Sequence, residues 1–355
     1  MMNNSDKEKF LSIVVPVYNS FLYINQCVDS FLNQDIPTDD YEIIIIDDGS
    51  DNGSEDILDE IAQNHSNIFV YHKENKGVSS ARNMGISLSC GKYVWFVDAD
   101  DFIAPNILGS LKNFTENQNS DRVKLESFSF HNELSLEEVK CRLENGELKS
   151  NVPYKEVMAT RTLYKREYLI KNNIMFLEGV HYGEDGVFNY QTLIHNPKTT
   201  QSGVLAYFYR VHDASATNAP KEKRVKKSLE GSKYIFDVLV DDYNKKICVV
   251  QTKRMLLYWM YAVIGHYSVL SYDYFCENFI WEHKLEHIPL RDFELRRLYR
   301  VLQELSKTHN YKKLKKTAES IAKNEQRKKA QKAVKKKILG YIKHPKRLLK
   351  IIFKK

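Results

Sequence analysis

The sequence has no apolar run long enough to cross a membrane. Its longest apolar stretch, Met255 to Leu270, includes Gly265 and His266 and is shorter than the ~20 residues that a spanning helix needs. The first ten residues are polar and charged, without the apolar core of a secretion signal. The 355 residues, 43% of them apolar and 28% charged, have the composition of a globular protein. We expect this protein to be cytoplasmic.

Cysteine is scarce and irregularly placed. The chain has five cysteines, and none of them forms a C-x-x-C pair. An odd number without such pairs argues against a disulfide framework and against a structural zinc site. We expect reduced thiols at Cys27, Cys90, Cys141, Cys248 and Cys276.

A glycine-rich phosphate loop is also missing. A dinucleotide-dependent dehydrogenase carries G-x-G-x-x-G after its first strand, whereas Pro16-Val17-Tyr18-Asn19 stands in that place here. A nucleotidyltransferase would carry a glycine- and arginine-rich loop at the same point. The sequence therefore disfavours both classes of enzyme.

Positive charge is concentrated at one end of the chain. Residues 311–355 hold 18 lysines and arginines against two glutamates, a net charge of +16, which leaves −9 for residues 1–310 of a chain whose total is +7. Apolar residues are interleaved with the lysines from Ile338 to Phe353, a pattern typical of a peripheral membrane anchor. RNA binding and a solvated, disordered tail are the alternatives. Because no aromatic stacking platform accompanies the lysines, we favour an anionic membrane and expect no nucleic-acid partner.

Apolar runs and helical patterns alternate through the first hundred residues. Four candidate strands, at Leu11–Val15, Ile43–Ile46, Ile68–Tyr71 and Tyr93–Val97, are separated by segments of helical periodicity. This alternation predicts an α/β fold, in which helices cover both faces of a mostly parallel sheet. The expected domains are 1–220 for this fold, 221–310 for a helical C-terminal region and 311–355 for the basic amphipathic tail.

Acidic side chains follow the second and fourth of these candidate strands. Because ligands of parallel sheets bind beyond the carboxyl ends of the strands, we expect the carboxylates to share one crevice. A divalent cation would relieve their repulsion, and oxygen ligands favour Mg²⁺ or Mn²⁺. Helix capping is the simpler interpretation, although a cap needs one residue and not the alternating pair Asp98 and Asp100. The five acidic residues are Asp47, Asp48, Asp98, Asp100 and Asp101.

Short motifs in a fixed order identify a family. They are Pro16-Val17-Tyr18-Asn19, Ile46-Asp47-Asp48-Gly49-Ser50, Asn75-Lys76-Gly77 with Ser80-Ala81-Arg82-Asn83, Val97-Asp98-Ala99-Asp100-Asp101 and Gly183-Glu184-Asp185-Gly186-Val187-Phe188. From about Leu11 to Ile107, and again around Glu184, the sequence resembles family 2 glycosyltransferases of the GT-A fold. The resemblance, together with the basic tail, suggests the type that acts in bacterial surface-polysaccharide synthesis. It implies a Rossmann-like sheet and a nucleotide-sugar donor, for which a UDP-sugar is the expected class.

The resemblance also implies roles for individual residues. Asp100, in the D-x-D element, is the expected metal ligand, and His212 would complete the shell around Mn²⁺ or Mg²⁺. Asp185 is the expected catalytic base, and its alternative role is to cap the helix that begins near Val187. The expected nucleotide-sugar-binding residues are Pro16, Tyr18, Asn19, Asp48, Gly77, Arg82, Asp98, Ala99, Glu184, Arg210 and Ser215.

These roles imply an inverting transferase. A carboxylate would take the proton of an acceptor hydroxyl on one face of the sugar while the nucleoside diphosphate leaves from the other. The expected acceptor is a glycan or a lipid-linked glycan, and the expected location is the inner face of the cell membrane, with the tail on anionic lipid. A non-catalytic carbohydrate-binding or scaffold protein of the same fold is the alternative. The joint presence of Asp98, Asp100 and Asp185 favours the enzyme.

Overall fold

The computed structural model describes residues 8–131, 133–152, 158–212 and 220–248, together with residues 252, 255, 256 and 259. The described residues up to Leu256 belong to one compact unit. Ser215, the basic tail over 311–355 and most of the helical region expected over 221–310 lie outside the described residues. The domain boundaries expected at 220 and 310 therefore stay predictions.

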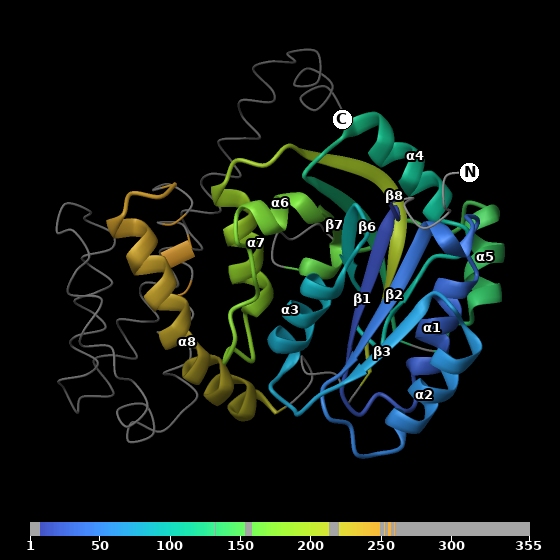
Figure 1. Cartoon of the computed structure of the whole chain (residues 1–355), viewed down its shortest axis with the longest axis horizontal. Helices are drawn as coiled ribbons and strands as arrows, with labels where there is room; N and C mark the ends of the chain where they lie inside the picture. The colour runs from blue at the N-terminus through green and yellow to red at the C-terminus, as the bar shows by residue number, and fades with distance from the viewer. Residues whose placement is uncertain are drawn as a thin grey trace, which may run out of the picture. The chain divides into compact units, whose positions relative to one another are not determined.

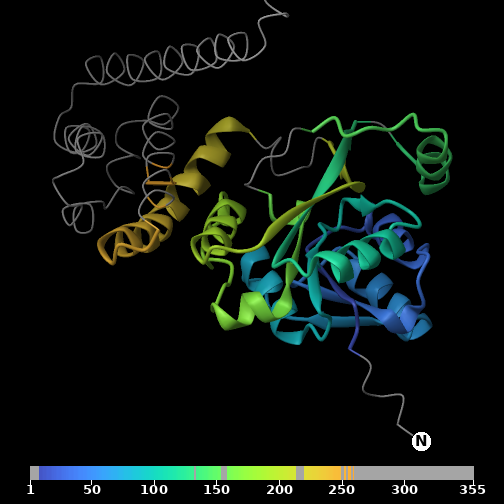
Figure 2. The same cartoon turned by 90° about the horizontal axis from the view of Figure 1, so that it is seen from above.

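The described part of the chain contains an eight-stranded sheet in the order β3-β2-β1-β4-β7-β6-β8-β5 (Figures 1 and 2). The first four strands of this order are parallel, β7 is antiparallel to both of its neighbours, and β6 is parallel to β8. The predicted α/β fold with a mostly parallel sheet is confirmed. The strands are β1 Leu11–Val17, β2 Tyr41–Asp47, β3 Ile68–His72, β4 Tyr93–Phe96, β5 Phe102–Ile103, β6 Arg122–Phe130, β7 Thr162–Lys165 and β8 Thr199–Arg210.

Helices cover both faces of the sheet, as predicted (Figure 1). Apolar residues of α1, α2, α4 and α5 pack on one face, and those of α3, α6 and α7 pack on the other. No helix in the described ranges is long and apolar enough to span a membrane. The helices are α1 Ile24–Leu32, α2 Ser54–Asn64, α3 Val78–Leu88, α4 Leu108–Gln118, α5 Leu136–Glu144, α6 Arg166–Lys171, α7 Glu184–Ile194 and α8 Lys221–Asn244, with the 3-10 helices η1 Thr38–Asp40 and η2 Ala159–Arg161.

The four consecutive isoleucines of β2 are explained by burial on both faces. Ile43 and Ile45 belong to the core under α1 and α2, whereas Ile44 and Ile46 pack under α3. Side chains alternate between the faces of a strand, so a strand covered on both sides is apolar at every position. The run ends where β2 reaches the sheet edge, and Asp47 follows.

Helix α3 lies unusually close to the sheet. A Cβ atom on Gly85 would lie 2.1 Å from Cγ1 of Val14 in β1, a distance that no side chain tolerates. The missing side chain therefore lets the helix pack directly against the central strand. This contact fixes the first turns of α3, including Arg82, beside the carboxyl ends of the strands.

Two helix starts differ from their sequence signals. Serine is a common N-cap residue, so Ser20 is a local signal for a helix start, but α1 begins at Ile24, and its N-cap residue Tyr23 makes no capping hydrogen bond through its side chain. Proline is common in a first helical turn, so Pro105 is a similar signal, but α4 begins at Leu108. The side chain of Gln34 accepts hydrogen bonds from the backbone N–H groups of Ile107 and Leu108 at 3.0 and 3.1 Å. A residue distant in sequence thus supplies the cap, which a local pattern cannot reveal.

Candidate active site

The loops that follow β1 and β2 are joined by reciprocal hydrogen bonds. The Asn19 side chain donates to Oδ1 of Asp51 and accepts from the Asp51 backbone N–H, both at 3.0 Å. Asn19 has a positive φ of 55°, which asparagine tolerates better than most residues. Beside these two hydrogen bonds, Tyr18 is 53% exposed. Pro16 lies within β1, opposite Ile46. The structure thus presents a free aromatic face at the sheet edge, suited to a planar ligand group.

Asp48 organises the loop that leads into α3. Its carboxylate accepts hydrogen bonds from the backbone N–H groups of Lys76 and Gly77 at 3.0 and 2.7 Å, and it forms an ion pair with Lys73. Gly77 has a φ of +88°, which only glycine adopts readily. The expected nucleotide residues Asp48 and Gly77 therefore contact each other, and Asp48 is buried.

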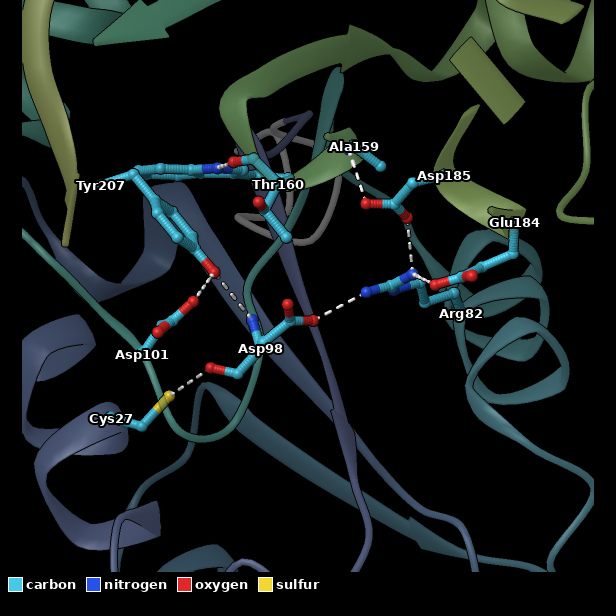
Figure 3. Close-up of polar contacts among 10 residues, drawn as sticks. Cys27, Arg82, Asp98, Asp101, Ala159, Thr160, Glu184, Asp185 and Tyr207 are labelled. Carbon is cyan, nitrogen blue, oxygen red and sulfur yellow. Dashed lines mark hydrogen bonds and ion pairs between the residues drawn. The ribbon is translucent and has the colours of Figure 1, made fainter. Parts of the chain in front are cut away.

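Arg82 is the centre of the acidic cluster at the sheet edge (Figure 3). Its guanidinium donates through Nη2 to Oδ1 of Asp98 at 2.7 Å and through Nη1 to Oδ1 of Asp185 at 2.8 Å. Oε1 of Glu184 lies 3.6 Å from Nη1. The arginine side chain is only 4% exposed, and its Cζ lies 5.1 Å from the centre of the Phe176 ring. Three residues expected at the site are thus held around one buried cation.

Burial sets the protonation of this cluster. Burial, followed by the charge of Asp185, raises the pKa of Glu184 to about 8, despite the opposing effect of Arg82. Burial also raises the pKa of Asp185, against the lowering effect of Arg82. For Arg82, burial alone would lower the pKa, but the charges of Asp185, Asp98 and Glu184 raise it above its ordinary value. At neutral pH, Glu184 therefore carries a proton while Arg82 remains charged.

The 3-10 helix η2 holds the second oxygen of Asp185. The Ala159 backbone N–H donates to Oδ2 of Asp185 at 3.0 Å. The next residue, Thr160, is fixed by a 2.7 Å hydrogen bond from the indole of Trp95 in β4 to its carbonyl (Figure 3). Both carboxylate oxygens thus have fixed donors, which set the side-chain rotamer. Asp185 lies in the first turn of α7, whose N-cap residue is Gly183, so Asp185 is not itself the N-cap.

The buried amide of Asn189 supports the same turn of α7 through a backbone carbonyl. The Asn189 side chain donates to the backbone carbonyl of Asp185 at 3.0 Å. Its Oδ1 accepts from Nη2 of Arg122 in β6 and from the hydroxyl of Tyr164 in β7, at 2.9 and 3.0 Å. All three side chains are buried. The network therefore links two strands of the sheet to the backbone of the expected base.

Asp100 and His212 meet across the sheet edge. Oδ2 of Asp100 lies 2.9 Å from Nε2 of His212, which follows the end of β8. Burial, followed by the charge of Asp98, raises the pKa of Asp100, while His212 acts to lower it. The described residues contain no group of three or more His, Cys, Asp or Glu side chains that could hold a metal ion by themselves. A carboxylate and an imidazole nonetheless suit an ion that takes its remaining ligands from phosphate and water.

Three of the five acidic residues are buried and do not line the crevice, which corrects the expectation from sequence; one of them is Asp48, whose contacts are given above. Asp47 is buried, where it contacts Nδ1 of His72 at 2.7 Å and accepts from the Ser50 N–H at 3.0 Å. Asp101 is also buried; it accepts from the Tyr207 hydroxyl and, at 2.7 Å, from the Arg210 N–H. By contrast, the side chains of Asp98 and Asp100 are each 34% exposed. Among the five, only this alternating pair has partly exposed side chains, with buried Ala99 between them.

Arg210 lies behind the Asp100 loop and is buried. Its Nε donates to the Asp100 carbonyl at 2.9 Å, and its Nη2 donates to the side chain of Gln26. Its Cζ lies 4.8 Å from the ring centre of Tyr23 and 5.0 Å from that of Phe130. Arg210, expected to bind the nucleotide sugar, thus supports the D-x-D loop through the Asp100 carbonyl. Ser215, the other downstream residue, lies outside the described residues.

Ala159 and Asn189 were missed from the sequence. Ala159 acts through its backbone, so its side chain carries no signal. Asn189 did leave a signal in the sequence, because it is a polar residue on the buried face of α7 beside Val187 and Phe188. It lies four residues after Asp185, on the same face of the helix.

The mostly parallel sheet with helices on both faces and the acidic cluster at its strand ends define a GT-A-type fold. The model for "Glycosyl transferase family 2" matches residues 12–170, somewhat less than half of the chain, so this segment is similar to glycosyltransferase family 2. It is 29% identical to the uncharacterized glycosyltransferase EpsJ of Bacillus subtilis over 233 residues, which cover 62% of this chain and 66% of that protein. It is 32% identical to the poly(ribitol-phosphate) beta-glucosyltransferase of Bacillus spizizenii over 206 residues, 57% of this chain and 32% of that protein. The chain thus spans one third to two thirds of these relatives.

Solved structures support the fold assignment. S. aureus TarS matches with a TM-score of 0.58 and 19% identity, over 88% of this chain and 55% of that chain. A TarS fragment, residues 1–349 in complex with UDP-GlcNAc, matches with a TM-score of 0.52 and 19% identity, over 74% of this chain and 84% of that chain. At this identity the likeness establishes a shared GT-A fold.

Proposed function

We propose that this protein transfers a sugar, with inversion, from a nucleoside diphosphate donor to a hydroxyl of a glycan or lipid-linked acceptor. The observation that carries the proposal is the bridge from Asp98 through Arg82 to Asp185. It joins the residue expected beside the donor ribose to the residue expected to deprotonate the acceptor. A scaffold that only binds carbohydrate has no need for a base whose two oxygens are both fixed.

The acceptor side depends on Asp185. Burial raises its pKa above the ordinary value of an aspartate, which makes the carboxylate a better proton acceptor. The hydroxyl oxygen attacks the anomeric carbon as the bond to the diphosphate breaks, and Asp185 takes the hydroxyl proton. Attack by one base-activated hydroxyl from the face opposite the leaving group inverts the anomeric centre. Arg82 keeps the carboxylate oriented through Nη1.

The donor side depends on the loops after β1, β2 and β4. Tyr18 offers an exposed ring to the base, for which uracil is our proposal, while Pro16, Asn19, Asp48 and Gly77 shape the surrounding loops. Asp98 lies toward the ribose, and Asp100 with His212 would hold Mg²⁺ or Mn²⁺. Such an ion would neutralise charge on the departing diphosphate. Arg210 supports that loop, and Ser215 completes the proposed set.

The acceptor class is inferred from relatives. One is named a poly(ribitol-phosphate) beta-glucosyltransferase, and another a minor teichoic acid biosynthesis protein, GgaB of Bacillus subtilis, with 35% identity over 34% of this chain. TarS was solved with UDP-GlcNAc. These names support a UDP-linked hexose or N-acetylhexosamine as the donor and a cell-surface polymer as the acceptor. We place the enzyme on the cytoplasmic face of the membrane.

A panel of UDP-sugars tests the proposal. The full chain is incubated with each donor and Mn²⁺ or Mg²⁺, and release of UDP is followed with and without chelator. We expect slow, metal-dependent hydrolysis of one donor class, and inversion at the anomeric carbon by NMR when an acceptor is found. The absence of UDP release and of UDP-sugar binding across the panel would favour the scaffold alternative.

The basic tail has its own test. We propose that residues 311–355, with a net charge of +16, bind anionic lipid at the cytoplasmic membrane surface. The full chain should sediment with vesicles containing anionic lipid, less so at high salt, whereas a chain ending at residue 310 should not. Equal sedimentation of the two proteins would contradict this role.

A further inference from the structure

A polar cavity outside the site described above lies against β6 and β8. Its volume is about 290 Å³, and it is lined by residues of β6, of the 150–152 segment, of η2 and of β8. This volume is near the lower end for cavities that hold small molecules. Four of its lining side chains carry charges or amides: Glu126, Asn151, Arg161 and Gln201. The cavity is therefore suited to a small, polar ligand.

Glu126 is an unusual residue for its position. It lies in β6, an interior strand between β7 and β8, and the pairing of β6 with β8 shifts register on both sides of it. Such bulges re-aim side chains and are common beside binding sites. Its half-buried carboxylate has no side-chain hydrogen bond or ion pair within the described ranges. Partial burial of a carboxylate without a hydrogen-bond partner costs free energy. A ligand that donates hydrogen bonds to Glu126 would offset this cost.

Arg161 also lines the cavity and connects it, through the chain, to the residue that holds the proposed base. Its side chain is 1% exposed, and its Nη2 donates to the Val152 carbonyl at 3.1 Å. It belongs to the same 3-10 helix as Ala159, whose N–H holds Asp185. Two residues of a 3-10 helix advance about 4 Å. One wall of the cavity and the N–H group that holds the proposed base therefore belong to the same 3-10 helix.

We propose that this cavity binds one uncharged sugar unit of the acceptor, next to the unit whose hydroxyl meets Asp185. The inference depends on the proposed transferase function. Glu126 can accept hydrogen bonds from hydroxyl groups, while Arg161 and the amides of Asn151 and Gln201 can donate to them. Because one acid and one base balance each other, the cavity favours a neutral polyhydroxyl ligand over a phosphate. Its apolar lining, from Leu125 and Val152, suits the C–H face of a sugar.

Saturation-transfer NMR on the full chain tests this site without using catalysis. The probes are the methyl β-glycosides of glucose, galactose and N-acetylglucosamine, each in the presence of UDP. We expect at least one to receive saturation from the wild-type protein, and Glu126→Gln to weaken its binding about tenfold. Glu144→Gln is the matched control, because Glu144 is exposed on α5, away from the cavity.

Donor hydrolysis separates this inference from the proposed function. Glu126→Gln should hydrolyse the UDP-sugar within about twofold of the wild-type rate, because hydrolysis uses the donor and water and leaves the proposed acceptor cavity empty. No binding of any glycoside to the wild-type protein, or equal binding to Glu126→Gln, would overturn the cavity assignment. Absence of donor hydrolysis in the wild type would instead refute the transferase, while the glycoside measurement would still report on the cavity.

Discussion

The Arg82 guanidinium donates a 2.8 Å hydrogen bond to Asp185, a residue 103 positions away in the sequence. Its other terminal nitrogen binds Asp98 at 2.7 Å. The fork geometry of one arginine therefore sets the spacing between the donor loop after β4 and the first turn of α7. This relationship carries the first prediction.

Arg82→Met should lower transfer by about 10²-fold or more and should destabilise the fold by ~2–3 kcal/mol, because it leaves partly buried carboxylates without their cation. Arg82→Lys should recover much of the stability but little of the activity, since an ammonium lacks the planar fork that reaches both acids. Thermal unfolding and initial rates measure the two effects. If Arg82→Lys retained full transfer, the fork would not be required.

The expectation that side chains after parallel strands gather at one edge of the sheet predicted part of this cluster and was wrong for other residues. It correctly indicated that Asp98 and Asp100 follow a buried strand, and both side chains are partly exposed there. It could not show that Asp101 turns inward, because its partners are the Tyr207 hydroxyl and the Arg210 N–H, more than a hundred residues away. The direction of a loop side chain depends on tertiary partners that a local pattern does not contain.

The sheet was predictable for a different physical reason. Burial on both faces leaves a continuous apolar run, as in the four isoleucines of β2, so the positions of β1 to β4 followed from apolar runs, whereas β5 to β8 did not. The start of α4 left no such record, because its cap comes from Gln34. Backbone donors such as the Ala159 N–H also leave no signal in the sequence, because they do not depend on the type of side chain. The sequence therefore predicts the scaffold better than the contacts that orient the site.

The protonation of Glu184 predicts a pH dependence of stability. Its pKa is raised from 4.5 to about 8 in the folded protein, so between these values the folded state binds more protons than the unfolded state. Stability from this group is full at low pH and is lost as pH rises toward 8, by at most about 1.4 kcal/mol per pH unit.

Glu184→Gln removes this titrating group and keeps the size of the side chain. Its melting temperature should therefore fall less than that of the wild type between pH 5 and pH 8.5, by a few degrees. Glu144→Gln, on exposed α5, should follow the wild type. Parallel melting curves for Glu184→Gln and the wild type would show that Glu184 titrates normally.

Asn189 should act on rate more than on donor binding. Asn189→Ala removes the amide that holds the Asp185 carbonyl and leaves Arg122 and Tyr164 without their acceptor. We expect kcat to fall about tenfold and the donor KM to change less than about twofold, with a loss of ~1–3 kcal/mol in stability. Asn189→Asp, which restores an acceptor for Arg122, should regain stability but not the full rate. A variant that lost stability and kept its kcat would show a merely structural role.

Asp100 and His212 should determine binding of the divalent ion. Electron paramagnetic resonance of Mn²⁺ with UDP present measures this without turnover. We expect Asp100→Asn and His212→Ala each to weaken Mn²⁺ binding by at least tenfold, and chelation to stop donor hydrolysis. His195→Ala is the control, since His195 is exposed after α7. Unchanged Mn²⁺ affinity in both variants would place the ion elsewhere.

The most direct test of the account compares transfer with donor binding in Asp185→Asn. The amide keeps the size of the side chain but cannot take the acceptor proton. The account predicts that transfer falls by about 10²-fold or more, while the dissociation constant for the UDP-sugar, measured by calorimetry, stays within about threefold of the wild type. Undiminished transfer, or an equal loss of donor affinity, would contradict the assignment of Asp185 as the base.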